Sequence, residues 1–264
     1  MSKSEIAGTT QPFAKHFSEL SSRLGPLSGQ IETAQALFAR VLIDAMARGP
    51  ITVDQYCSYL SMQYHLAKDV QTYFFTIAAH ASLGKRRRLR RFLCEFANEE
   101  ELHYLVAGND LMAFGRIPCA EPIDVMLWHY YYRSVVASRP FQRLGAAAIL
   151  ENVSGGVARS PSNKALSAPF LSKENTKFLV LHQHETVPHG QQILEALDAE
   201  VLSVEELDDL LLGAKRATVL YVRMAAWALN ENNLARVADP ESDMSALNSR
   251  DIERLSTAEL GIEK

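Results

Sequence analysis

The sequence predicts an all-α protein that folds as a single-domain bundle of about seven core helices. Apolar residues recur every three or four positions through successive long segments, which is the spacing of one face of an α-helix. No segment shows the convincing alternation of apolar and polar residues that is typical of a half-buried strand. A chain of 264 residues is also long enough to bury one large core.

Capping and turn residues separate the expected helices. Gly49 ends the first helix. Thr52 and Gln55 have capping-box spacing at the start of the second, and Ser203 and Glu206 have it at the start of the last. In chain order, the expected helices cover residues 28–49, 52–84, 94–115 after the basic run 84–93, 124–138, 141–156, 172–200 and 203–232.

The two ends of the chain carry weaker helical patterns than the middle. We expect a flexible N-terminus over residues 1–15, the helical domain over 16–233, and a tail or short helix over 234–264. No internal repeat or low-complexity tract suggests a second domain.

Composition and charge exclude several classes of protein. The formal net charge is -4, so the composition favours no nucleic-acid partner. Cys57, Cys94 and Cys119 are too few and too scattered for a disulfide framework or a thiolate zinc site, which indicates a reducing compartment. The chain shows neither a signal-peptide pattern nor a bilayer-spanning apolar run, so we expect a cytoplasmic protein without a membrane partner.

Two segments offer acidic and imidazole groups that suit a metal. Glu100 and His103, in "EEELHYL", have the Glu-x-x-His spacing that presents both groups to one metal in helical bundles. Glu151 lies in the largely apolar "AILENVSGG", where an unpaired charge is costly. The ordinary alternatives are a solvated charged face for the first pair, and an ion pair with Arg143 or Arg159 for Glu151.

The segment "LHQHETVPHG" adds the remaining candidate ligands. His182, Glu185 and His189 stand at i, i+3 and i+7 of the expected helix 172–200, within roughly 60° of one another. Pro188 is expected to kink this helix beside His189. Together the three segments supply three carboxylates, which offset most of the charge of two ferrous ions, and mixed oxygen and nitrogen donors without thiolate favour iron or manganese.

The sequence, with this ligand pattern, resembles the heme-oxygenase-like diiron oxidases. Their fold is shared with heme oxygenases, TenA thiaminases and PqqC. The resemblance runs from about Leu37 to Leu229. It assigns metal-ligand roles to Glu100, His103, Glu151, His182 and His189. Thr186 stands where the family has an aspartate, and Glu185, one residue earlier, is the nearest acid.

The resemblance also implies an activity. It implies an oxygen-dependent nonheme iron oxidase or oxygenase that binds Fe(II), two per chain, and acts on a small carboxylic or amino acid-type metabolite. A homodimer and an external electron donor are further expectations of the same kind.

The substrate would lie against the core helix that contains "MQYHLAKDVQTYF". Gln63, His65 and Gln71 are the candidate substrate contacts there, and Asp69 is a candidate additional metal ligand. Arg133 is a candidate bidentate partner for a substrate carboxylate. The apolar stripe of the same helix is core packing in any case.

Three other functions remain open. A heme oxygenase would use His16 as the axial ligand and the glycines of "ENVSGG" as a kink. A metal-free enzyme like TenA or PqqC is the second; a TenA-like thiaminase would need a nucleophilic cysteine, and Cys94 and Cys119 do not stand where that nucleophile is expected. A helical partner-binding or metal-storing protein is the third. The basic run Lys85–Arg91 could attract an anionic substrate or an acyl carrier protein, although such runs are usually only solvated.

Overall fold

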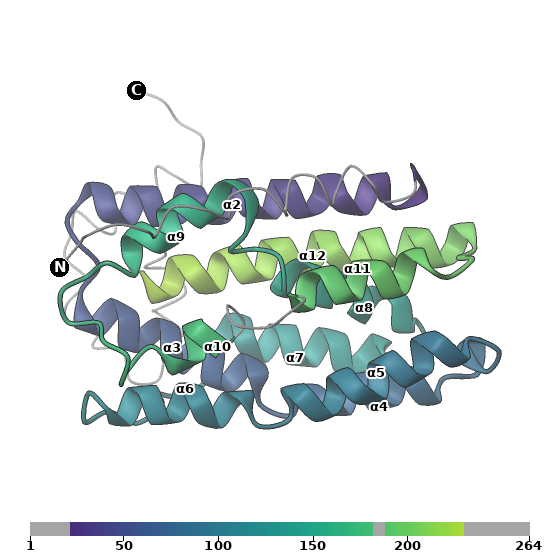
Figure 1. Ribbon diagram of the computed structural model, residues 1–264, viewed down its shortest axis with the longest axis horizontal. Coiled ribbons are helices and arrows are strands. Elements are labelled where there is room, and N and C mark those ends of the chain that lie inside the picture. Colours follow the sequence, from purple (N-terminus) through teal and green to yellow (C-terminus); the bar gives the residue numbers. More distant parts are fainter. Residues whose placement is uncertain (1–21, 182–187, 230–264) are drawn as a thin grey trace, which may run out of the picture.

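The computed structural model describes residues 22–181 and 188–229, and every regular element in these ranges is a helix (Figure 1). The predicted all-α fold is therefore confirmed. The 3-10 helices are η1 (Ser22–Leu24), η2 (Ala81–Leu83) and η3 (Gly156–Ala158), and the α-helices are α2 (Gly25–Ala47), α3 (Val53–Ala67), α4 (Val70–Ala79), α5 (Arg87–Glu100), α6 (His103–Met112), α7 (Ile123–Val135), α8 (Pro140–Leu150), α9 (Arg159–Ala165), α10 (Lys177–Leu181), α11 (His189–Asp198) and α12 (Val204–Ala228). None of these helices combines the length and the apolar character needed to cross a bilayer.

The helices run along the long axis of the molecule, with α12 in the middle (Figure 1). Helix α12 packs most extensively against α8, and also contacts α2, α7 and α3. Helix α4 pairs with α5, and α3 pairs with α6, in the layers farthest from α2. Helices α2, α4, α7 and α11 also pack against α8, and all of its residues from Pro140 to Ile149 are buried.

Glycines allow the backbones of α8 and α12 to come into direct contact. A Cβ atom on Gly145 would lie 2.0 Å from the carbonyl oxygen of Leu210, and one on Gly213 would lie 1.9 Å from that of Gln142. Both distances are far below van der Waals contact, so any side chain at either position would force the two helices apart. The close contact fixes the position of α8, whose C-terminal end carries Glu151.

Both predicted capping boxes are confirmed. The Thr52 hydroxyl accepts a bond of 3.2 Å from the Gln55 backbone N–H, and the Gln55 side chain accepts one of 2.9 Å from the Thr52 N–H. Ser203 and Glu206 form the same reciprocal pair at the start of α12. Each box satisfies backbone donors that the first helical turn leaves without partners.

Two predicted long helices are each divided. The expected helix 52–84 ends at Ala67 and resumes at Val70, because Asp69 adopts the left-handed conformation with φ of 62°. The expected helix 94–115 begins earlier, at Arg87, and is interrupted by a turn at residues 101–102. Glu100 and His103 therefore lie on either side of a helix junction instead of within one continuous turn.

The expected helix 172–200 is also wrong as a single element. Hydrogen bonds between Ser172 and Asn175 hold the first residues as a turn, and α10 begins only at Lys177. Pro188 has an extended ψ of 141° and stands immediately before α11, so it starts this helix and does not kink it. Helix α8 ends at Leu150, short of the expected end at residue 156, and α9 was not expected from the sequence.

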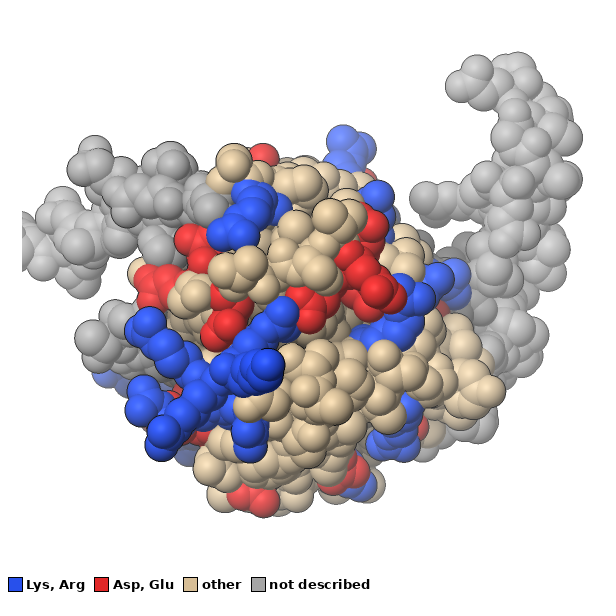
Figure 2. Space-filling view, turned by 90° about the vertical axis from the view of Figure 1, so that its right-hand side faces the viewer, with Lys and Arg blue, Asp and Glu red and all other residues tan. Residues whose placement is uncertain are grey.

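The basic run Lys85–Arg91 lies at one end of the molecule, among acidic side chains. Figure 2 views this end and shows Lys and Arg gathered next to Asp and Glu. Arg86 is paired with Glu206 at 2.7 Å, and Arg91 lies 3.7 Å from Glu95. The acidic neighbours offset part of the positive charge, as is usual for a solvated face.

Candidate metal centre

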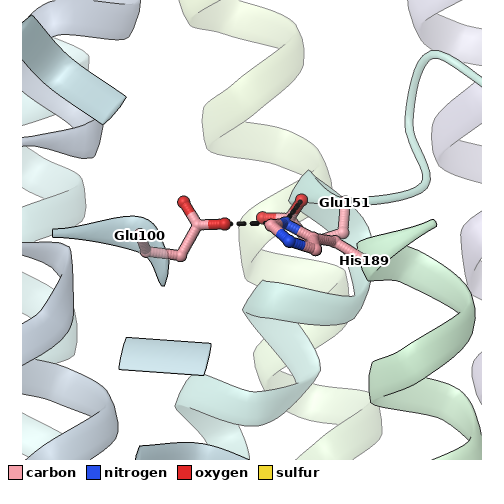
Figure 3. Close-up of side chains that lie close together, drawn as sticks. All are labelled: Glu100, Glu151 and His189. Carbon is pink, nitrogen blue, oxygen red and sulfur yellow. Dashed lines mark ion pairs between the residues drawn. The ribbon is translucent and has the colours of Figure 1, made fainter. Parts of the chain in front are cut away.

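Three side chains from the ends of three helices converge in the interior (Figure 3). Glu100 is the last residue of α5, Glu151 follows the last residue of α8, and His189 is the first residue of α11. One ligand atom from each lies within 4.8 Å of the others. Glu100 and His189 are 5% and 3% exposed, so water screens this group very little.

Local packing between α8 and α11 brings His189 to Glu151. The chain turns immediately after α8, and Asn152 in this turn is buried against the start of α11. A Cβ atom on Gly190 would lie only 2.4 Å from the Asn152 side-chain oxygen. Glycine at position 190 therefore allows the close approach that places His189 beside the carboxylate.

The distances show one carboxylate shared by two imidazoles. His189 Nδ1 lies 2.7 Å from Glu100 Oε1 and 3.7 Å from Glu151 Oε2. His103 Nδ1 lies 2.7 Å from the other oxygen of Glu100, which accepts its hydrogen bond. The two imidazole rings are nearly parallel, with centroids 6.1 Å apart. Glu100 is thus the central member of the group.

The electrostatics of the group favour a charged Glu100 and a protonated His189. Burial by itself raises the pKa of Glu100, but the hydrogen bonds from His103 and His189 outweigh it and lower that pKa. Burial by itself lowers the pKa of His189, but Glu100 and Glu151 outweigh it and raise that pKa to about 10. In the metal-free protein at neutral pH, an imidazolium ion therefore stands between two carboxylates.

The structure brings together part of the predicted ligand set. Glu100, Glu151 and His189 form the group, and His103 contacts it through Glu100. His182 and Glu185 lie outside the described residues. The side chain of Asp69 is exposed and does not belong to this group.

A cavity of about 500 Å³ opens beside the group. Glu100, His103, Glu151 and His189 form one part of its wall. Much of the remaining wall is apolar, with contributions from Phe38, Leu42, Ile51, Leu66, Leu150 and Phe178. The cavity is large enough for a small organic molecule placed against the carboxylates.

The expected substrate contacts are distributed unevenly around this cavity. Gln63 lines it, whereas His65, Gln71 and Arg133 are not among its described lining residues. His65 Nε2 bonds instead to the carbonyl oxygen of Cys119 at 2.7 Å. Arg133 is exposed, and Gln71 is half-buried in α4.

Two tyrosines join Gln63 in the cavity wall and were missed in the sequence. The Gln63 amide nitrogen donates to the Tyr59 hydroxyl at 2.8 Å and to the Tyr221 hydroxyl at 3.1 Å. The hydroxyls lie 3.2 Å apart, so one donates to the other. Burial raises the pKa of both, which keeps them protonated. Tyr59 and Gln63 show i, i+4 spacing, but nothing in the sequence links them to Tyr221 on α12.

The cysteines do not lie at the cavity. Cys57, Cys94 and Cys119 are free thiols, and none is among its described lining residues. A metal-free mechanism with a nucleophilic cysteine thus finds no support among the residues in this wall. His16, the candidate axial ligand of a heme, lies outside the described residues.

Comparison with solved structures identifies the fold. The chain is similar to a domain of unknown function with a heme oxygenase-like fold from Shewanella denitrificans OS217, with a TM-score of 0.64 and 20% sequence identity over 89% of this chain and 99% of that one. No protein-family model and no curated protein matches the sequence. The protein thus has a heme oxygenase-like fold, as the sequence resemblance implied, with a buried group of two carboxylates and a histidine in its interior.

Proposed function

We propose that this protein is an oxygen-dependent nonheme iron oxidoreductase. The observation that carries the proposal is the convergence of Glu100, Glu151 and His189, within 4.8 Å, on the wall of an internal cavity. A heme oxygenase-like fold is compatible with this function but does not by itself assign it.

The donor set fits a ferrous ion. Two carboxylates and an imidazole, without a thiolate, are the ligand types that iron and manganese prefer over structural zinc. Two carboxylates this close, one buried and one half-buried, repel each other unless a cation stands between them, and the protonated His189 fills that role in the metal-free protein. Glu100, Glu151 and His189 would hold the metal, with His103 adjoining. Iron, when bound, supplies the one-electron chemistry that reaction with oxygen requires.

The remaining residues of the cavity would bind and orient the substrate. The apolar wall favours a small molecule with an apolar body, in line with the expected carboxylic or amino acid-type metabolite. Among the described residues, the Gln63 amide donates to both tyrosine hydroxyls, and one hydroxyl donates to the other. This leaves the hydrogen of one hydroxyl without an acceptor in the group. The remaining hydroxyl hydrogen would orient an acceptor oxygen of the substrate. An external electron donor would supply any electrons that the substrate does not.

Anaerobic iron binding tests the proposal directly. Ferrous iron is added to metal-free protein and the bound iron per chain is counted. Glu151→Gln and His189→Ala should each weaken iron binding at least about tenfold, because each removes a ligand. The matched controls are Glu32→Gln and His80→Ala, which lie outside the cavity wall and should bind as the unaltered chain does.

Two results would contradict the proposal. One is the absence of iron binding, with a Soret band appearing when heme is added instead. The other is unchanged iron binding in both ligand variants. Two irons per chain would support roles for His182 and Glu185 in a second site, and one iron would identify a mononuclear centre.

A further inference from the structure

A buried arginine without a carboxylate partner among the described residues lies two aromatic rings away from His189. Arg143, on α8, is 1% exposed, and no ion pair joins it to an acid within the described part of the chain. Its Nε and Nη1 atoms are buried without a hydrogen-bond acceptor among the same residues. Burying a charge in this way destabilises the fold unless something offsets it.

Aromatic rings surround this guanidinium group. Its central carbon lies 4.8 Å from the ring centroid of Tyr73, 5.2 Å from that of Phe74, and 5.8 Å from those of Trp128 and Tyr132. The negative faces of such rings attract a cation, and the attraction is strongest where water is excluded. The rings hold the charge in place without neutralising it.

A continuous aromatic wall connects the arginine to the metal centre. The Phe74 ring, which Arg143 contacts, lies 4.9 Å from the Phe96 ring, and the Phe96 ring lies 4.7 Å from the His189 imidazole. Phe74 and Phe96 are 2% and 1% exposed, so little solvent intervenes. Charges separated by such a dry interior interact more strongly than they would across water.

We propose that Arg143 is the built-in counter-ion of the metal centre, and that its fixed positive charge weakens the binding of divalent cations to Glu100 and Glu151. The proposal rests on the proposed metal site. Without metal, the two carboxylates, the His189 imidazolium and the guanidinium sum to a charge of 0. One divalent ion that displaces the His189 proton brings the charge to +1. A second divalent ion would raise the charge to +3, so Arg143 opposes a second metal more strongly than the first.

The attraction of the two carboxylates for Arg143 supports this assignment. Burial lowers the pKa of Arg143, and Tyr73, Tyr132, Glu151 and Glu100 act in the opposite direction. Both metal-ligand carboxylates therefore stabilise the charged guanidinium. The same positive charge repels an incoming cation.

Neutral variants of Arg143 test the proposal with Co(II) as the probe, because Co(II) absorbs in the visible when bound. Arg143→Met and Arg143→Gln remove the charge, and methionine suits the aromatic surroundings. Arg143→Lys retains the charge. Arg86→Met is the control, because Arg86 also lies over an aromatic ring, 5.3 Å from the Phe141 centroid, but stands at the opposite end of α5 from Glu100.

We expect both neutral variants to bind Co(II) about tenfold more tightly, or better, from the loss of one unit of repulsion across a dry interior. Arg143→Lys and Arg86→Met should stay within about threefold of the unaltered protein. A purely structural role predicts the opposite direction, because loosened packing weakens a metal site.

Equal or weaker Co(II) binding by both folded neutral variants would overturn the inference while leaving the metal site intact. If both neutral variants fail to fold and the lysine variant folds, the charge serves folding and the inference is also overturned. If the unaltered protein binds no Co(II) and no Fe(II), the proposed function fails first, and the inference fails with it.

Discussion

At the scale of single residues, protonation of His189 competes with metal binding. Its pKa is raised to about 10 by Glu100 and Glu151 against the effect of burial, so the metal-free site contains a proton at the position that a metal would occupy. Because this pKa lies above that of the unfolded chain, the pairing stabilises the metal-free protein below about pH 6.5, and the contribution is lost as the pH rises toward 10.

The affinity for metal should therefore rise with pH. Between pH 6 and 8, the dissociation constant for Co(II) should fall about tenfold per pH unit, because each bound ion displaces one proton from His189. A titration in weak buffer should also detect about one proton released per ion. His189→Ala should lose this dependence. A dissociation constant that does not change with pH would show that His189 is not a ligand.

At the scale of helices, the contact between α8 and α12 determines where Glu151 lies. Gly145 and Gly213 allow the two backbones to touch, and Glu151 follows directly from the C-terminal end of α8. The start of α11 packs on Asn152 through Gly190, and this contact fixes the position of His189. The geometry of the metal centre thus depends on close backbone packing at positions that carry no functional group.

Gly213→Ala should destabilise the protein by about 1–3 kcal/mol or more, because the added Cβ would lie 1.9 Å from the Gln142 carbonyl oxygen. Urea unfolding measures the loss. The control is Gly29→Ala in α2, where a Cβ atom meets nothing within 4 Å. There we expect a gain of roughly 0.5–1 kcal/mol from helix propensity. Equal stability of the two variants would refute the proposed role of the glycine contact.

At the scale of the whole molecule, the metal centre ties together parts of the chain that are distant in sequence. Glu100, Glu151 and His189 come from α5, α8 and α11. The unfolded chain holds no such arrangement, so a metal that binds there binds the folded state preferentially.

Metal should therefore raise the stability of the protein. At a free concentration of 100 times the dissociation constant, the gain is about 2.7 kcal/mol, or roughly 5–10 °C in the unfolding temperature. Thermal unfolding with and without Co(II) measures the shift, and a chelator should reverse it. The same shift in His189→Ala would show that the metal stabilises the protein from some other site.

Prediction from the sequence was most successful where the cause is local. Thr52 with Gln55 and Ser203 with Glu206 form capping boxes because only three residues separate the partners. It was less successful at the breaks within helices. Asp69 adopts a left-handed conformation that breaks the helix. An aspartate also occurs within continuous helices, so the sequence pattern did not reveal this break. Pro188 was recognised as a disruption, but its role as the start of α11 was not.

The sequence by itself determined that this protein is a bundle of helices, and that Glu100, Glu151 and His189 lie in patterns suited to a metal. Helical periodicity and ligand spacing are properties of neighbouring residues, so a single sequence shows them. Only the tertiary structure decided that ligand atoms of these three side chains lie within 4.8 Å of one another, that Tyr221 joins Gln63, and that two buried nitrogens of Arg143 have no acceptor among the described residues. These contacts depend on how distant helices pack, which local spacing does not specify.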